Sequence, residues 1–235
     1  MLLTTIIFLP LVAGLLASLL LPAKQVKTGA LLVMIADLLL VLYAAFGGGF
    51  DWSGGFSQTA ALFGGSVETP FQLRAHVPWI PEFGVSFTVG VDNLSMIMII
   101  LTTALGIIGV LCSWTAIDKR EKEYYFFLLM LQTGIMGTFL ALDMFLFYIF
   151  WELMLVPLYF LIGIWGSKNR LYATMKFVLY TLVGSLLMLI AIIWMYYNNG
   201  EMVNNVMEYE RTYSYEAMLA TQSGKGAAAS FFHSD

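Results

Sequence analysis

The chain has 235 residues, of which 60% are hydrophobic and only 11% are charged, and its mean hydropathy is +0.84. Soluble domains carry about 25% charged residues, so this composition excludes a water-soluble enzyme, a disordered chain and a disulfide-rich scaffold. The net charge of −4 argues against a nucleic-acid-binding protein, which needs a basic surface. With two histidines and a single cysteine, Cys112, the usual metal or iron–sulfur ligand sets cannot be assembled.

Six apolar segments predict an all-α, polytopic membrane protein, because a helix needs about 20 such residues to cross the bilayer. These segments are residues 2–21, 30–46, 94–114, 124–142, 144–165 and 171–197. A cleaved signal peptide is the alternative for the first segment. The basic region that precedes the apolar stretch of such a peptide is missing here, so the sequence favours a retained helix.

Two segments are predicted to lie outside the membrane. Between the second and third spans, residues 47–92 contain two runs of β-branched and aromatic residues, 71–77 and 84–91. Pro78, Pro81 and Gly84 separate the runs, which predicts a small β-hairpin. The stretch 198–235 is more polar and is expected to form loop and short helix, with its last dozen residues disordered.

The distribution of lysine and arginine predicts the orientation of the spans. Basic residues follow the first, third and fifth spans, whereas the segment 47–92 has four acidic residues and one arginine. The basic set is Lys24, Lys27, Lys119, Arg120, Lys122, Lys168 and Arg170. The basic connections are therefore expected in the cytoplasm, and both termini on the other side of a bacterial cytoplasmic membrane.

Three ionisable residues fall within the predicted spans, where a charge is costly and calls for an explanation. Glu152 lies roughly 13 Å and 21 Å from the two ends of the fifth span at 1.5 Å per residue, near mid-membrane. Pro157 leaves the carbonyl of Leu153 without its helical partner, and this carbonyl could hold water or a side chain near the carboxylate. Glu152 is either a proton-carrying carboxylate or one paired statically with a neighbouring helix.

Lys176 lies roughly 9 Å inside the sixth span, counted from Arg170. Its ammonium group either takes part in transport or reaches back to the membrane surface. Glu152 is some 10 Å deeper, so direct pairing is not expected. Three polar residues of the fourth span could connect the two groups or simply pack helices. They are Gln132, Thr133 and Thr138.

Asp37 is the single acid of the second span, and such a residue more often meets a neighbouring helix or subunit than a substrate. Asp143, between the fourth and fifth spans, is interpreted as a turn residue. The sequence has no glycine-rich phosphate loop, no nucleophile–base motif and no cysteine-rich cofactor motif. Redox or hydrolytic chemistry is therefore expected in other chains.

Several segments resemble a known family. Residues 147–166, FYIFWELMLVPLYFLIGIWG, resemble the fifth transmembrane helix of the subunit M (chain 4) family of respiratory complex I, the proton-translocating NADH–quinone oxidoreductase. Residues 173–188 look like the next helix of that family. Residues 90–95 are similar to the entry into its third helix, with Asn93 where glycine is usual. The resemblance runs from residue 1 to about residue 222.

The resemblance implies an antiporter-like, proton-translocating membrane subunit. In this interpretation Glu152 matches the mid-membrane glutamate of the family and Lys176 the lysine of the following helix. Family members have about fourteen helices, with further lysines and a glutamate on helices seven, eight and twelve. Those residues have no counterpart here, so this chain is expected to be an N-terminal portion.

The resemblance also implies what lies in other chains. NADH, flavin, iron–sulfur clusters and quinone are expected in other subunits, with no cofactor bound here. The expected partners are other membrane-arm subunits, including antiporter-like paralogues, and the lipid bilayer. Two alternatives stay open, a subunit of a multi-subunit cation/proton antiporter and a structural scaffold without translocation. The mechanistic hypothesis is that Glu152 exchanges a proton and that its charge state is coupled to a lysine.

Overall fold

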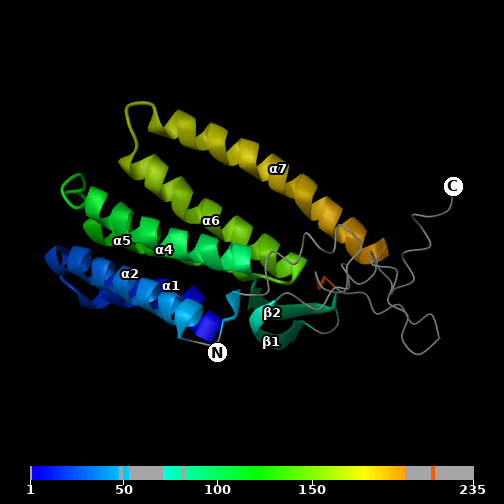
Figure 1. The fold of residues 1–235 in the computed structure, drawn as a ribbon. Coiled ribbons are helices and arrows are strands. Elements are labelled where there is room, and N and C mark those ends of the chain that lie inside the picture. Colours follow the sequence, from blue (N-terminus) through cyan, green and yellow to red (C-terminus); the bar gives the residue numbers. More distant parts are fainter. Residues whose placement is uncertain (1, 48–49, 53–70, 81–82, 199–212, 215–235) are drawn as a thin grey trace, which may run out of the picture.

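The computed structural model describes residues 2–47, 50–52, 71–80, 83–198 and 213–214. In this part of the chain, helices lie lengthwise beside one another and a β-hairpin sits at one end of them (Figure 1). The helices are α1 (Leu2–Leu20), α2 (Ala23–Phe46), α4 (Asn93–Ser113), α5 (Glu121–Leu140), α6 (Met144–Trp165) and α7 (Arg170–Asn198). The antiparallel hairpin consists of β1 (Gln72–Ile80) and β2 (Val85–Val91).

Within the described residues, five helices are long and apolar enough to cross a membrane, namely α1, α2, α4, α6 and α7. The remaining helix, α5, begins with the charged residues Glu121, Lys122 and Glu123, and it carries Gln132 and Thr133 near its middle. The predicted all-α membrane architecture with a small hairpin is thus confirmed. The predicted count of six spans is not, because α5 falls outside the apolar set.

Helix α5 is less apolar because protein, rather than lipid, covers much of it. Its backbone approaches the neighbouring helices closely at positions without a Cβ atom. A Cβ on Gly134 would come within 2.6 Å of Met154 on α6, and one on Gly137 would overlap the ring of Phe150. On another side, Leu129 packs against Gly14 of α1. Small residues at such contacts let helices pack tightly in membranes.

The structure corrects the predicted hairpin in one respect. Pro78 was expected to separate the two runs, but it lies inside β1 and pairs with Ser86. Proline is tolerated at a sheet edge, where its missing N–H breaks no ladder, and a register shift follows it between Pro78 and Ile80. Gly84, at the turn, adopts a φ of 65°, a left-handed conformation that glycine enters without strain.

The two ends of the helix layer are held by different contacts, a lysine with its polar partners at one end and the β-hairpin at the other. At the end away from the hairpin, Lys27 bonds Glu121 at 3.2 Å and donates to the carbonyls of Trp114 and Ile117 at 2.9 and 3.1 Å. At the hairpin end, the N–H of Leu142 donates to the carbonyl of Thr88 at 2.9 Å. The connections α1–α2, α4–α5 and α6–α7, which hold most of the basic residues, share the first end (Figure 1).

Helix α1 packs into the interior of this layer. Its buried residues are Leu3, Ile6, Ile7, Pro10, Gly14 and Ala17. The predictions for the tail 198–235 fall almost wholly outside the described residues, because the structure describes only Asn198, Tyr213 and Ser214 of this stretch.

Candidate functional site

Glu152 lies near the middle of α6 and faces α7. Its Oε1 atom is buried and has no hydrogen-bond partner. The hydroxyl of Tyr148, one turn earlier on α6, lies close to both Glu152 and Ser185 of α7. Ser185 is 3% exposed and donates to the carbonyl of Leu182 at 3.0 Å. A half-buried carboxylate with one buried oxygen atom thus lies beside two hydroxyl groups at the α6–α7 contact.

Pro157 is buried in α6, five residues beyond Glu152. Because proline has no N–H, it leaves the carbonyl of Leu153 without the usual partner, next to the carboxylate in sequence. Phe150 and Pro157 share the buried side of α6, and Phe150 packs against α5. Glu152 therefore lies on a helix that packs against α5 on one side, and the carboxylate is on the other side, toward α7.

Lys176 does not face Glu152. Its side chain is exposed, and its Nζ atom lies 4.6 Å from the centre of the Tyr172 ring on the same helix. The inward side of α7 carries Thr174 and Ser185 instead, which are 1% and 3% exposed. The two groups are thus not brought together within the described residues, as the depth difference predicted.

Of the two interpretations of Gln132, a group that connects Glu152 with Lys176 or a residue that packs helices, its position favours the second. Its Oε1 atom lies against Gly106 of α4, where a Cβ would be 3.0 Å away, so the side chain points away from α6. Thr138 donates to the carbonyl of Gly134 in its own helix at 2.9 Å. Thr133 is fully buried and its hydroxyl has no partner. The prediction missed this because helical phase, not depth, decides which helix a side chain meets.

Asp37 is fully buried inside the chain, and both of its carboxyl oxygens lack a hydrogen-bond partner. The Gln132 side chain lies beside it. The expectation that this acid meets a neighbouring helix is therefore met by α5. Gln132 itself is 4% exposed, and its Nε2 atom also has no partner.

Asp143 was predicted to be a turn residue. In the structure it is the buried N-cap of α6. Its Oδ1 accepts from the N–H groups of Phe145 and Leu146 at 2.9 and 3.0 Å. Its Oδ2 accepts from the N–H and the hydroxyl of Ser86 on β2 at 3.0 and 3.2 Å. A carboxylate at a helix N-terminus satisfies N–H groups that have no partner in the helix.

A chain of polar contacts connects this cap to the hairpin surface, and the sequence did not reveal it. The hydroxyl of Ser86 lies 2.8 Å from that of Thr88, which lies 2.7 Å from Nδ1 of His76 on β1. Alternate residues of β2 share one face, and the pairing of His76 with Thr88 completes the chain. Only the strand alternation could have indicated it.

Tyr213 supports the same junction. Its carbonyl accepts from the N–H of Met144 at 2.9 Å, and its ring stacks on Tyr196 of α7 with centroids 4.2 Å apart. Burial, followed by Tyr196, Tyr197 and Asp143, raises the pKa of the Tyr213 hydroxyl. The start of α6 and the end of α7 are thereby fastened together.

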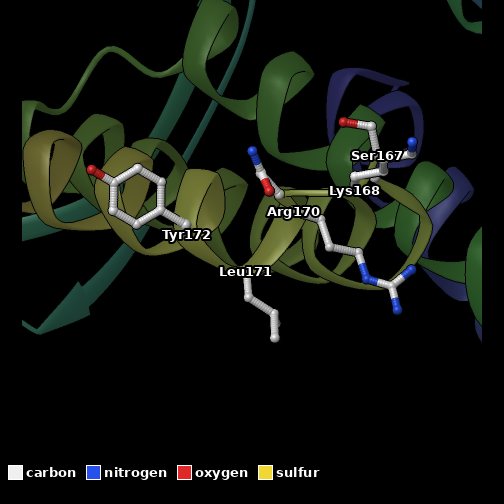
Figure 2. A pocket seen from close by; sticks show the side chains of 7 residues that line it. Ser167, Lys168, Arg170, Leu171 and Tyr172 are labelled. Carbon is white, nitrogen blue, oxygen red and sulfur yellow. The ribbon is translucent and has the colours of Figure 1, made fainter.

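An open pocket lies at the α6–α7 connection, lined by residues Gly166 to Tyr172 (Figure 2). Figure 2 shows the side chains of Arg170, Leu171 and Tyr172 pointing in different directions from the chain. Gly166 is roughly 21 Å along the helix from Glu152, so the pocket is separate from that carboxylate. Among the residues that the structure describes, no group of three or more potential ligands could hold a metal ion.

Residues 141–233 match a family model described as NADH:quinone oxidoreductase/Mrp antiporter, transmembrane. NADH-quinone oxidoreductase subunit M of Escherichia coli (strain K12) is 38% identical over 205 residues, which are 84% of this chain and 37% of that protein. A chain of respiratory complex I from Thermus thermophilus with bound NADH has a TM-score of 0.72 at 25% identity, covering 94% of this chain and 39% of its own length.

A chain of the Mrp complex from Dietzia sp. DQ12-45-1b has a TM-score of 0.64 at 19% identity and covers 82% of this chain and 19% of its own length. This is a likeness of fold. The fold and these matches define the class: residues 141–233 carry the antiporter-type membrane domain of NADH:quinone oxidoreductases and Mrp antiporters. Within that family its sequence is similar to subunit M, and it spans less than two fifths of that relative's length.

Proposed function

We propose that this chain forms part of an antiporter-like, proton-translocating subunit in the membrane arm of an NADH–quinone oxidoreductase. In this role it moves protons while other subunits carry electrons from NADH to quinone. The chain itself is a non-redox component, and NADH, flavin, iron–sulfur clusters and quinone bind to its partners. The observation that carries the proposal is the buried, unpartnered Oε1 atom of Glu152 in the middle of an apolar helix.

Glu152 is the proton carrier of this proposal. A carboxyl group without a fixed ionic partner can gain or lose a proton as its surroundings change. Tyr148 and Ser185 supply hydroxyl groups beside it that can donate to the ionised form and accept from the protonated form. Pro157 leaves the carbonyl of Leu153 free, and this carbonyl, in the residue after Glu152, can hold water for the proton transfer.

The proposed topology has six spans, with α5 as the fourth. Although α5 is less apolar than the others, contacts with α1, α4 and α6 surround it, so protein replaces lipid around its polar side chains. With an even number of spans, the start of the first span and the end of the last span lie on the same side of the cytoplasmic membrane. The concentration of lysine and arginine at the other end supports a cytoplasmic location for that end. Other membrane-arm subunits, including antiporter-like paralogues, are the proposed partners.

The test is Glu152→Gln in the assembled complex, compared with Glu123→Gln. Glu123 forms an exposed ion pair with Arg120 at 2.8 Å, which makes it a carboxylate with no expected transport role. Losing a positioned proton-transfer group lowers proton pumping on the order of 10²-fold, while the control keeps the wild-type rate. Proton pumping and NADH–quinone turnover are measured in vesicles. Unchanged pumping by the Glu152 variant overturns the assignment and favours a scaffold role.

A cation/proton antiporter is the second candidate, and the Mrp fold likeness favours it. The same vesicles distinguish the two functions. NADH-driven acidification supports the oxidoreductase, whereas a sodium gradient that drives proton movement without NADH supports the antiporter. The oxidoreductase is preferred because the sequence relationship to subunit M covers 84% of this chain.

A further inference from the structure

Asp37 is a second acidic residue inside an apolar helix, and the proposed role of Glu152 does not explain how its charge is tolerated there. It lies roughly 18 Å from the start and 14 Å from the end of the apolar stretch Gln25–Phe46 of α2, at 1.5 Å per residue. Its exposed fraction is 0%, and neither carboxyl oxygen has a hydrogen-bond partner. An ionised carboxylate in such a place is strongly disfavoured unless something compensates its charge.

The described neighbours offer no positive charge. The helices α1 and α4 contain no Lys, Arg or His, and the one titratable side chain of α4, Cys112, is exposed near its end. Lys27, on α2 itself, is about 15 Å along the helix and is bound to Glu121 and two carbonyls. The ionisable residues of α5 lie in its first turns, between Glu121 and Tyr125.

One neutral polar group is aimed at the same place. The Gln132 side chain of α5 lies beside Asp37, and its Nε2 atom is buried without a partner. Gly106 of α4 makes room for it, since a Cβ there would come within 3.0 Å of Gln132 Oε1 and 2.9 Å of Met34 Sδ. Three helices thus build a closed polar site around one carboxyl and one amide.

We propose that Asp37 and Gln132 form a proton-binding site in which Asp37 is a neutral carboxylic acid. A protonated carboxyl group has one O–H donor and one carbonyl acceptor, and a primary amide has the complementary pair. The acid O–H then donates to Gln132 Oε1, and Gln132 Nε2 donates to the remaining carboxyl oxygen. This reciprocal pair satisfies the three unpartnered atoms at once, which an ionised carboxylate does not, because it only accepts.

A proton fits the site better than a metal ion. Metal cations in proteins need several oxygen or nitrogen ligands, and the described residues provide one carboxyl group with one amide here. The site is also distinct from Glu152, which faces α7, whereas Asp37 lies beside Gln132 and the Gln132 side chain points toward α4. The chain therefore has two protonatable carboxyl groups at mid-membrane, on different sides of α5.

Infrared difference spectroscopy of the assembled membrane complex tests the proposal at neutral pH. Subtracting the spectrum of Asp37→Asn from that of the wild type is expected to leave the C=O stretch of a protonated carboxylic acid, shifted in heavy water. Bands of an ionised carboxylate in its place overturn the proposal. Asparagine keeps the shape of the acid and its pairing with Gln132, so the variant is expected to assemble.

Gln132→Leu provides an independent arm. Removing the amide is expected to shift the acid band to higher frequency, because its hydrogen bonds are lost, while the chain still accumulates in the membrane. An unshifted band contradicts the pairing. Failure of this variant to accumulate also overturns the proposal, since a neutral acid tolerates an apolar neighbour and an ionised one does not. These readouts do not depend on proton pumping, so they stand apart from the test of Glu152.

Discussion

Asp37 and Asp143 are both buried aspartates, with exposed fractions of 0% and 1%, but their surroundings are opposite. Asp143 accepts hydrogen bonds from three backbone N–H groups and a hydroxyl, at the junction of the hairpin and α6. Asp37, in the middle of α2, accepts no hydrogen bond at either carboxyl oxygen. The difference follows from position, because free N–H groups exist at a helix start and not in its interior.

The comparison separates structural acids from candidate functional ones. A carboxylate that is fully bonded to backbone groups stabilises one arrangement of the chain. A carboxyl group without such bonds is a candidate for a different role, and Glu152 resembles Asp37 in having an oxygen, Oε1, that is buried without a partner. Burial alone does not distinguish the two kinds, whereas the donors around each oxygen do.

The largest expected effect is that of Asp143→Ala. It removes the N-cap and leaves N–H groups of α6 and β2 buried without an acceptor, at a cost of about 3 kcal/mol of unfolding free energy. The melting temperature of the purified chain, followed by tryptophan fluorescence, measures the loss. Asp143→Asn keeps one acceptor oxygen and is expected to lose less. Equal stability of the alanine variant and the wild type contradicts the capping role.

Gly106→Ala is expected to have the next largest effect. The added methyl group presses on Gln132 and Met34 beside Asp37, and such overpacking costs about 1–3 kcal/mol. Gly109→Ala on the same helix is the matched control, because a Cβ there meets nothing within 4 Å. Thermal unfolding of the two variants is compared. A control that is as unstable as Gly106→Ala would show that helix backbone, not the polar site, is responsible.

Ser86→Ala tests the Asp143 side of the comparison more gently. It removes the hydroxyl between Thr88 and Asp143 but keeps the backbone N–H bond to Oδ2, so a loss of about 1 kcal/mol is expected. Ser18→Ala is the control, since that exposed hydroxyl bonds only the carbonyl of Leu15 in its own helix. The same melting experiment is sufficient. A larger loss for the control refutes the inferred chain of contacts.

Asp37→Asn is expected to have the smallest effect on stability, a change within about 0.5 kcal/mol, because a neutral acid and an amide differ little in size and desolvation cost. The melting temperature is measured beside that of Asp143→Ala. A loss as large as that of Asp143→Ala would mean that Asp37 is an ionised, bonded carboxylate, and the contrast between the two aspartates would disappear.

The sequence predicted the helices and the hairpin well, because apolar segment lengths and turn residues are local properties. The fifth predicted span, Met144–Trp165, coincides with α6. The second span was predicted to begin at residue 30, but α2 begins at Ala23, because lysines near a helix end can leave the apolar region without ending the helix. The fourth predicted span, 124–142, falls on α5, which is not among the helices apolar enough to cross a membrane and whose residues Gln132 and Thr133 are buried.

The candidate site was only partly predictable. Depth along a helix placed Glu152 near mid-membrane, since it needs only residue counting. The direction of each side chain did not follow, because it depends on how neighbouring helices are rotated. Residue counting therefore did not show that Lys176 points outward or that Gln132 points toward α4.

The contact between Gly14 and Leu129 has a consequence for biosynthesis. The two residues are about 115 positions apart in the chain. At a synthesis rate of about 5–20 residues per second, α1 waits roughly 6–23 s before α5 emerges. The inner face of α1 is covered during that interval by lipid or by the insertion machinery rather than by its final partner. Assembly of this layer therefore begins with an exchange, in which α5 displaces whatever first sheltered α1.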